Sequence, residues 1–285
     1  MTEKPLISVI IPAHNNEQTI ATAIESMVKQ TYTNLEIIVI DDNSTDDTKK
    51  VVRKLIERYE NLFFYPLPFD DPNRFNKRGR NINAGYAARN YGFEKVHGEW
   101  ITFQDADDAS LLNRIEVQYG LVTRYDAIHV CVDWQKFNPA LLGKTLDADR
   151  ILREHPDAII WPQDITALAK KTKGVLIPFL GPINALIPFE WKRFMVINKF
   201  FFRALDPYPG TGNSPLFKRE VIEKVRFRKL SDRVWPSFMG RGADRDFNFQ
   251  VAETYKNSIV VLLPLYMWRV NIQNQFWVDI FRYLV

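Results

Sequence analysis

Four short apolar runs, separated by segments of helical periodicity, organise the first 104 residues of the sequence. The runs are Leu6–Pro12, Leu35–Ile40, Asn61–Tyr65 and Glu99–Gln104. Continuous apolar runs rich in β-branched residues are typical of strands buried on both faces. Between the runs, segments such as "IATAIESMVKQ" repeat their apolar residues at helical spacing. This alternation predicts an α/β fold with a mostly parallel central sheet flanked by helices.

Two further patterns predict where the next helices begin. The segment "STDD", Ser44 to Asp47, matches a capping box and predicts a helix that starts there and runs to about Tyr59. The segment "AGYAARNYGFEKV" predicts the helix that precedes the fourth strand.

The second half of the sequence is less regular. The segments "YDAIHVCVDW" and "SIVVLLP" predict strands, and "GNSPLFKREVIEKV" and "RGADRDFNFQVAETY" each predict entry into a helix. Residues 134–212 form an excursion rich in proline, aromatic and basic residues, which we expect to be irregular. We expect a single domain over residues 1–285, with a first half over 1–125, a second half over 126–265 and an aromatic tail over 266–285.

The composition is that of an ordinary soluble protein with a mild basic excess. The net charge is +4 and the pI is near 9.0, which suits an anionic ligand or an acidic membrane surface. Because the basic residues are scattered and no recognition motif occurs, we expect no nucleic-acid partner. The lone Cys131 indicates a reducing compartment and is expected to pack in the core. With no apolar leader and no apolar run of about 20 residues, we expect a cytoplasmic protein.

Acidic residues follow two of the predicted strands, and a polar loop follows a third. The second strand ends in Asp41 and Asp42, the fourth in Asp105, Asp107 and Asp108, and the first leads into the loop from Pro12 to Glu17. Three carboxylates within four residues fit either a solvated turn that caps a helix or a divalent cation site. Because ligands of parallel sheets bind beyond the carboxyl ends of the strands, the position favours the cation.

Four segments, in order, resemble the inverting glycosyltransferases of family 2, which have the GT-A fold, a Rossmann-like nucleotide-diphospho-sugar transferase fold. They are "SVIIPAHNNEQTI" from Ser8, "EIIVIDDNSTDDT" from Glu36, "NAGYAARNYGFEKVHGEWITFQDADD" from Asn83 and "GADRDF" from Gly242. The resemblance is strong over residues 6–125, moderate over 210–256 and absent across the excursion. It implies metal-dependent transfer of a sugar from a nucleotide-diphosphate donor, by family habit a UDP-sugar, to a hydroxyl of a saccharide or lipid-linked acceptor. A bacterial surface polysaccharide or glycolipid pathway is the setting that it suggests.

The resemblance also assigns residues. Asp107 is the expected ligand of Mn²⁺ or Mg²⁺, and Asp105 contacts the metal or the ribose, whereas Asp108 is left as a supporting residue or a helix cap. The expected contacts of the nucleotide-sugar are Pro12, Ala13, His14, Asn15, Glu17, Asp42, Asn83, Arg89, Asp105 and Ala106. His14 stands where many relatives carry an aromatic residue, usually tyrosine, and Gly85 permits a close approach of the backbone.

An inverting transfer needs a base for the acceptor hydroxyl. The resemblance assigns this role to Asp244, with Asp246 as the second candidate. Ala243 replaces the glutamate that relatives usually carry before this aspartate. The alternative is that both aspartates only begin a helix, where acidic residues are favourable.

Two aromatic segments leave their partners open. Residues 187–205 mix aromatic and basic residues, which fits a helix on the inner membrane surface or a helix that walls the acceptor cleft. The stripe within 276–284 fits docking on the domain, a partner subunit, lipid or further sequence. Two rival functions remain, a non-catalytic binding protein of the same fold and a sugar-phosphate nucleotidylyltransferase. The second is disfavoured because "PAHNNEQT" lacks the glycines of that class.

Overall fold

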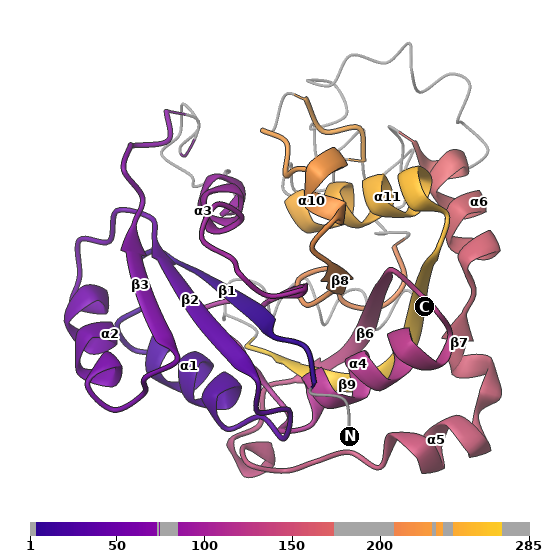
Figure 1. Ribbon diagram of the computed structural model, residues 1–285, viewed down its shortest axis with the longest axis horizontal. Helices are drawn as coiled ribbons and strands as arrows, with labels where there is room; N and C mark the ends of the chain where they lie inside the picture. The colour runs from indigo at the N-terminus through magenta and orange to yellow at the C-terminus, as the bar shows by residue number, and fades with distance from the viewer. Residues whose placement is uncertain are drawn as a thin grey trace, which may run out of the picture.

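The computed structural model describes residues 4–72, 74, 85–173, 208–229, 232–235 and 242–269. Within these residues, nine strands form one mixed sheet (Figure 1). In sheet order they are β3 (Leu62–Pro66), β2 (Leu35–Asp41), β1 (Ile7–Ala13), β4 (Trp100–Phe103), β8 (Leu216–Lys218), β6 (His129–Lys136), β9 (Ser258–Trp268) and β5 (Ala109–Ser110), while β7 (Ile159–Ile160) pairs with β9.

The first four strands confirm the predicted parallel sheet. β1 lies between β2 and β4, β2 also pairs with β3, and all three pairings are parallel. Beyond β4 the sheet is mixed, because β8 runs antiparallel to both β4 and β6, while β6 and β9 are parallel. The strand order reverses at β1, since β2 and β3 continue on one side of it and β4 returns on the other. This switch point opens a crevice beyond the carboxyl ends of β1 and β4.

Helices cover both faces of the sheet around β1, which explains why β1, β2 and β4 are mostly apolar and buried along nearly their whole length. On one face, Ile7, Val9 and Ile11 of β1 pack with α1 (Ile20–Val28), α2 (Thr48–Ile56) and α4 (Arg114–Arg124). On the other, Ile10 packs with α3 (Tyr86–Gly92), α10 (Val221–Lys224) and α11 (Ala243–Tyr255). Successive strand residues point to opposite faces, so the residues of β1 contact the two helical layers in alternation. Figure 1 shows the two layers on either side of the strands.

The excursion is more regular than its composition suggested. Its described part contains η1 (Pro139–Leu141), α5 (Ala148–Glu154), η2 (Pro156–Ala158) and α6 (Pro162–Thr172). Three of these begin with a proline. Proline is favourable at the first position of a helix, because an N–H there would have no hydrogen-bond partner within the helix. In residues 134–173 these prolines start helices and do not interrupt them.

The predicted capping box at Ser44 is also wrong. Helix α2 begins at Thr48, and Ser44 Oγ instead accepts a hydrogen bond from the backbone N–H of Asn15 at 3.0 Å. The Ser44 N–H faces the carboxylate of Asp41, 3.3 Å from Oδ1. Ser44 therefore joins the β1–α1 loop to the β2–α2 loop and does not start the helix.

Several predictions fall outside the described residues, namely Asn83, the aromatic and basic segment 187–205 and the stripe within 276–284. In the part of the chain that is described, none of the helices combines the length and the hydrophobicity that crossing a membrane requires. Cys131 is fully buried on β6, as expected, and burial raises the pKa of its thiol to about 12.

Candidate functional site

A cavity of about 830 Å³ lies at the crevice beyond β1 and β4, and we refer to it as the central cavity. Nine of the residues predicted from the sequence line it: Pro12, Ala13, His14, Asp42, Arg89, Asp105, Ala106, Asp107 and Asp244. Its volume lies within the range of small-molecule sites, and its lining includes charged groups from several strand ends. The topology alone brings these residues together.

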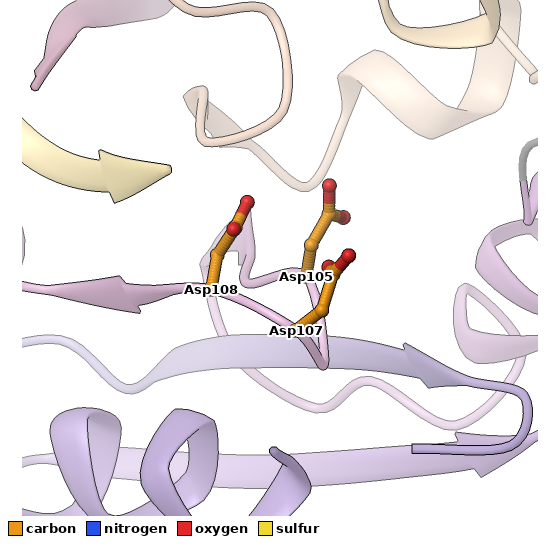
Figure 2. Close-up of side chains that lie close together, drawn as sticks. All are labelled: Asp105, Asp107 and Asp108. Atoms are coloured by element: carbon orange, nitrogen blue, oxygen red, sulfur yellow. The ribbon is translucent and has the colours of Figure 1, made fainter. Parts of the chain in front are cut away.

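Three carboxylates form an acidic cluster at one wall of the central cavity. Oxygen atoms of Asp105, Asp107 and Asp108 all lie within 4.8 Å of one another. Figure 2 shows the three side chains on the connection between β4 and β5, with their carboxylates projecting to the same side. Asp108 does not cap a helix, because β5 follows it directly and α4 begins only at Arg114. The helix-cap interpretation of Asp108 is therefore wrong.

The cluster is electrostatically costly. Burial, followed by the negative charges of Asp107 and Asp105, raises the pKa of Asp108 well above its ordinary value. Asp108 is held by two donors, since Tyr266 Oη donates to Oδ2 at 2.8 Å and the Arg269 N–H donates to Oδ1 at 2.6 Å. Three neighbouring carboxylates that repel one another favour a bound positive charge. Their oxygen atoms are the ligands that a hard divalent cation prefers.

Arg89 is the ion-pair partner of this cluster. Its Nη2 lies 2.5 Å from Asp105 Oδ1, and its side chain is only 7% exposed. The guanidinium also lies over the rings of Phe103 and Phe227, at 5.6 and 5.5 Å from their centroids. Gly85 makes room for it, because a Cβ there would stand 2.9 Å from Arg89 Nη1 and the backbone φ is +67°. Arg89 is thus a buried residue of the site and not a surface helix arginine.

The two candidate bases occupy different environments. Asp244 lies in the first turn of α11 and lines the central cavity. Asp246 is fully buried, and its carboxylate accepts hydrogen bonds from the N–H groups of Val234 and Trp235 and from Gln250 Nε2. Burial is the main cause that raises the pKa of Asp246. Asp246 therefore ties α11 to the 232–235 segment, and only Asp244 faces the cavity.

The segment 208–214 spans the space between Asp244 and the acidic cluster. Asn213 Nδ2 donates to Asp105 Oδ2 at 2.8 Å, and the neighbouring Gly212 packs against the Asp244 carboxylate. Asn248, one turn after Asp244, donates from Nδ2 to the Gly212 carbonyl at 2.8 Å. Its Oδ1 lies 2.9 Å from Nε2 of the fully buried His129, whose pKa burial lowers to about 4. A neutral imidazole N–H therefore fixes the orientation of the Asn248 amide.

The predicted nucleotide loop divides into residues that reach the central cavity and residues that hold the loop. His14 and Asp42 line the cavity, where Arg74 donates to the Asp42 carbonyl at 2.6 Å and to its Oδ1 at 2.5 Å. Asn15 and Glu17 do not line it. Asn15 Oδ1 accepts from the Thr45 N–H at 2.8 Å, and Glu17 Oε2 accepts from the Asp47 N–H at 2.9 Å.

Sequence reasoning missed much of the opposite wall of the central cavity. The missed lining residues are Asn16, Asp133, Trp134, Tyr208, Gly210, Thr211, Gly212, Asn213, Trp268 and Arg269. Most belong to β6, β9 and the end of the excursion, where no local pattern indicates a ligand. Only the pairing of β6 with β9 brings them opposite the acidic cluster.

The strand order, the acidic cluster at the switch point and the base candidate on α11 define a GT-A fold, the class of nucleotide-diphospho-sugar transferases. The family model described as "Glycosyl transferase family 2" matches residues 8–194, about two thirds of the chain. The chain belongs to glycosyl transferase family 2, and the predicted family and fold are confirmed.

Named relatives agree with this assignment. A "UDP-Glc:alpha-D-GlcNAc-diphosphoundecaprenol beta-1,3-glucosyltransferase WfgD" of Escherichia coli is 29% identical over 51% of this chain and 53% of its own length. A "GalNAc(5)-diNAcBac-PP-undecaprenol beta-1,3-glucosyltransferase" of Campylobacter jejuni is 38% identical over 38% of this chain and 31% of its own length. The chain thus spans about half, or less, of the length of these curated relatives.

Solved structures share the fold at low identity. TarS 1-349 of S. aureus in complex with UDP-GlcNAc has a TM-score of 0.53 and 16% identity, covering 93% of this chain and 58% of that chain. The mannosyltransferase PcManGT of Pyrobaculum calidifontis, in complex with GDP-Man and Mn²⁺, has a TM-score of 0.53 and 18% identity, covering 99% of this chain and 61% of that chain.

Proposed function

We propose that this chain transfers a sugar from a UDP-sugar to a hydroxyl acceptor, with Asp244 as the base and the acidic cluster as the site of Mn²⁺ or Mg²⁺. The observation that carries the proposal is the common cavity: Asp105, Asp107 and Asp244 line one space, and segment 208–214 connects them. The choice of substrate is supported by the name of the Escherichia coli relative, which gives UDP-Glc as its donor, and by the undecaprenol-linked acceptors in the names of both relatives.

The cation is best held by Asp107 and Asp105, with Asp108 completing the set of oxygen donors. When bound, the ion stabilises the negative charge that gathers on the departing diphosphate, worth several kcal/mol in the transition state. The mutual repulsion of the three carboxylates supports this assignment, since a double positive charge offsets the repulsion by Asp107 and Asp105 that, after burial, raises the pKa of Asp108. Arg89 holds Asp105 and adds a positive charge near the same phosphates.

His14 and Asp42 stand at the base-binding end of the cavity. Nδ1 of His14 lies 2.6 Å from the Asp42 carbonyl oxygen and 2.8 Å from Nη1 of Arg74, so the three residues contact one another. We propose that the base stacks near His14 and that its polar edge meets the pair formed by Asp42 and Arg74. The loop contacts of Asn15 and Glu17 keep this arrangement in place.

Asp244 takes the proton of the acceptor hydroxyl as that oxygen attacks the anomeric carbon, and the bond to the diphosphate oxygen breaks. A positioned carboxylate typically contributes about 10²–10⁴-fold to the rate. The cavity leaves Asp244 accessible, whereas Asp246 is occupied by three hydrogen-bond donors. Direct displacement gives inversion at the anomeric carbon, as the family resemblance implies.

The test is UDP release from UDP-glucose, UDP-galactose and UDP-N-acetylglucosamine, measured with and without Mn²⁺ after a thermal-shift screen of the same donors. We expect one donor to stabilise the protein only with the ion and to be turned over slowly in water. A non-catalytic protein of the same fold, the remaining alternative, would bind a donor without releasing UDP. The family assignment sets the nucleotidylyltransferase alternative aside.

A further inference from the structure

Two tryptophans line the wall of the central cavity that faces away from the nucleotide loop. Trp134 on β6 and Trp268 on β9 both line the cavity, and their ring centroids lie 5.0 Å apart with an interplanar angle of 87°. The two strands are neighbours in the sheet, so adjacent backbones hold the rings. The two rings therefore form an edge-to-face pair in the wall of the cavity.

Trp134 is a partly exposed ring that lines the central cavity. Its exposed fraction is 37%, whereas Trp100 and Trp235 are 5% and 0% exposed. Leaving a large apolar ring in water forgoes the stabilisation that burial would give. A ring held at the edge of a ligand cavity regains that stabilisation when a ligand covers it.

An irregularity in the pairing of β6 with β9 lies at Asp133 and Trp134, and both side chains line the central cavity. The register of β6 against β9 shifts on either side of Asp133, and such bulges commonly re-aim side chains beside sites. Asp133 Oδ1 accepts from the Trp134 N–H at 2.8 Å, and both residues line the cavity. Burial raises the pKa of Asp133, because desolvation disfavours its charged form. Hydroxyl donors from a ligand would replace the water that this carboxylate has lost.

We propose that Trp134, Trp268 and Asp133 form the subsite for a pyranose ring of the acceptor, which makes the acceptor a saccharide. This inference rests on the proposed function, because the subsite shares the central cavity with Asp244 and the acidic cluster. A pyranose has an apolar C–H face that stacks on indole and hydroxyl edges that donate to a carboxylate. An acyl chain would pack against the tryptophans but would offer Asp133 no hydrogen-bond donor. A lone hydroxyl would have no apolar face to stack on the rings.

The experiment compares Trp134→Ala, Trp134→Phe and Asp133→Asn with wild type and with Trp161→Ala. Trp161 is a matched control, since it is 39% exposed and makes an edge contact with Tyr125 at 5.3 Å, yet does not line the cavity. The acceptors are octyl glycosides of glucose, galactose and N-acetylglucosamine, with 1-octanol as the acyclic comparison. The readouts are the acceptor KM from UDP release and, separately, the Kd of UDP with Mn²⁺ by calorimetry.

We expect at least one glycoside, and not octanol, to be an acceptor for wild type. Trp134→Ala and Asp133→Asn should each raise its KM at least tenfold, Trp134→Phe less than threefold and Trp161→Ala not at all, while the Kd of UDP changes less than twofold throughout. An unchanged KM in both Trp134→Ala and Asp133→Asn would overturn the subsite. So would equal use of octanol, or rejection of every glycoside by a wild type that binds UDP. Failure of wild type to bind UDP with Mn²⁺ would instead overturn the proposed function, and the subsite with it.

Discussion

Gly212 lies so close to the carboxylate of Asp244 that a Cβ at position 212 would stand 2.7 Å from Oδ2 and 3.2 Å from Asn248 Nδ2. The hydrogen bond from Asn248 to the Gly212 carbonyl holds the backbone in that place. The position of the proposed base is therefore set by a backbone contact from another segment of the chain.

Gly212→Ala should lower kcat by about tenfold to hundredfold, because displacing a reacting group by about 1 Å can cost about hundredfold. The matched control is Gly120→Ala in α4, where a Cβ would meet no atom within 4 Å. That variant should keep full activity and gain about 0.5–1 kcal/mol of stability from the higher helix propensity of alanine. Steady-state kinetics and denaturant unfolding of both variants check this, and equal kcat values in the two would contradict the role of Gly212.

Asp244→Asn should impair catalysis, whereas Asp246→Asn should impair stability. Asp244→Asn should lower kcat about 10²–10⁴-fold while the Kd of UDP with Mn²⁺ stays within about twofold, because the amide cannot accept the acceptor proton. Asp246→Asn should lower the free energy of unfolding by about 1–3 kcal/mol, since its two carboxylate oxygens together accept three hydrogen bonds and one of them would become an NH₂ group that faces a donor. Full turnover by Asp244→Asn would remove the base assignment.

The contacts of Glu36, near the start of β2 and away from the central cavity, predict that the stability of the protein depends on pH. Burial alone would raise its pKa, but hydrogen bonds from Ser8, His97 and Gly98 outweigh burial and hold the pKa below its ordinary value of 4.5. A lowered folded-state pKa gives stability that is present above the unfolded pKa and lost as pH falls through the folded one. Glu36→Gln should therefore destabilise the protein by about 1–3 kcal/mol at pH 7 and by less below pH 4. Urea unfolding at the two pH values measures this, and an equal loss at both would contradict it.

Elements of the fold could be predicted from the sequence where neighbouring residues alone determine them, and not where distant residues do. The strands β1 to β4 were predicted to within about one residue, because the nearly complete burial of β1, β2 and β4 and the partial burial of the edge strand β3 leave mostly apolar residues in each of them. Ser44 was misassigned because a capping pattern is short, and its hydroxyl serves a contact with Asn15 that only the fold brings about. The helices α5 and α6 were missed because neither is strongly apolar and because their flanking prolines suggested interruption.

The same distinction holds for the site. The acidic cluster could be found because its members lie within four residues of one another and follow a strand. Asn213 and Trp134 could not, because the contact of Asn213 with Asp105 joins residues 108 positions apart and the cavity wall of Trp134 depends on the pairing of β6 with β9. Arg89 was recognised as a candidate, but only the fold shows that it pairs with Asp105.

The most direct test is a calorimetric titration of UDP into wild type and Asp107→Ala, each with and without Mn²⁺. We predict that Mn²⁺ tightens UDP binding to wild type and that Asp107→Ala removes about hundredfold or more of this gain. Asn113→Ala, a change outside the central cavity, serves as the control and should bind as wild type does. Equal UDP affinity with and without the ion in wild type, or an unchanged gain in Asp107→Ala, would contradict a cation held by the acidic cluster.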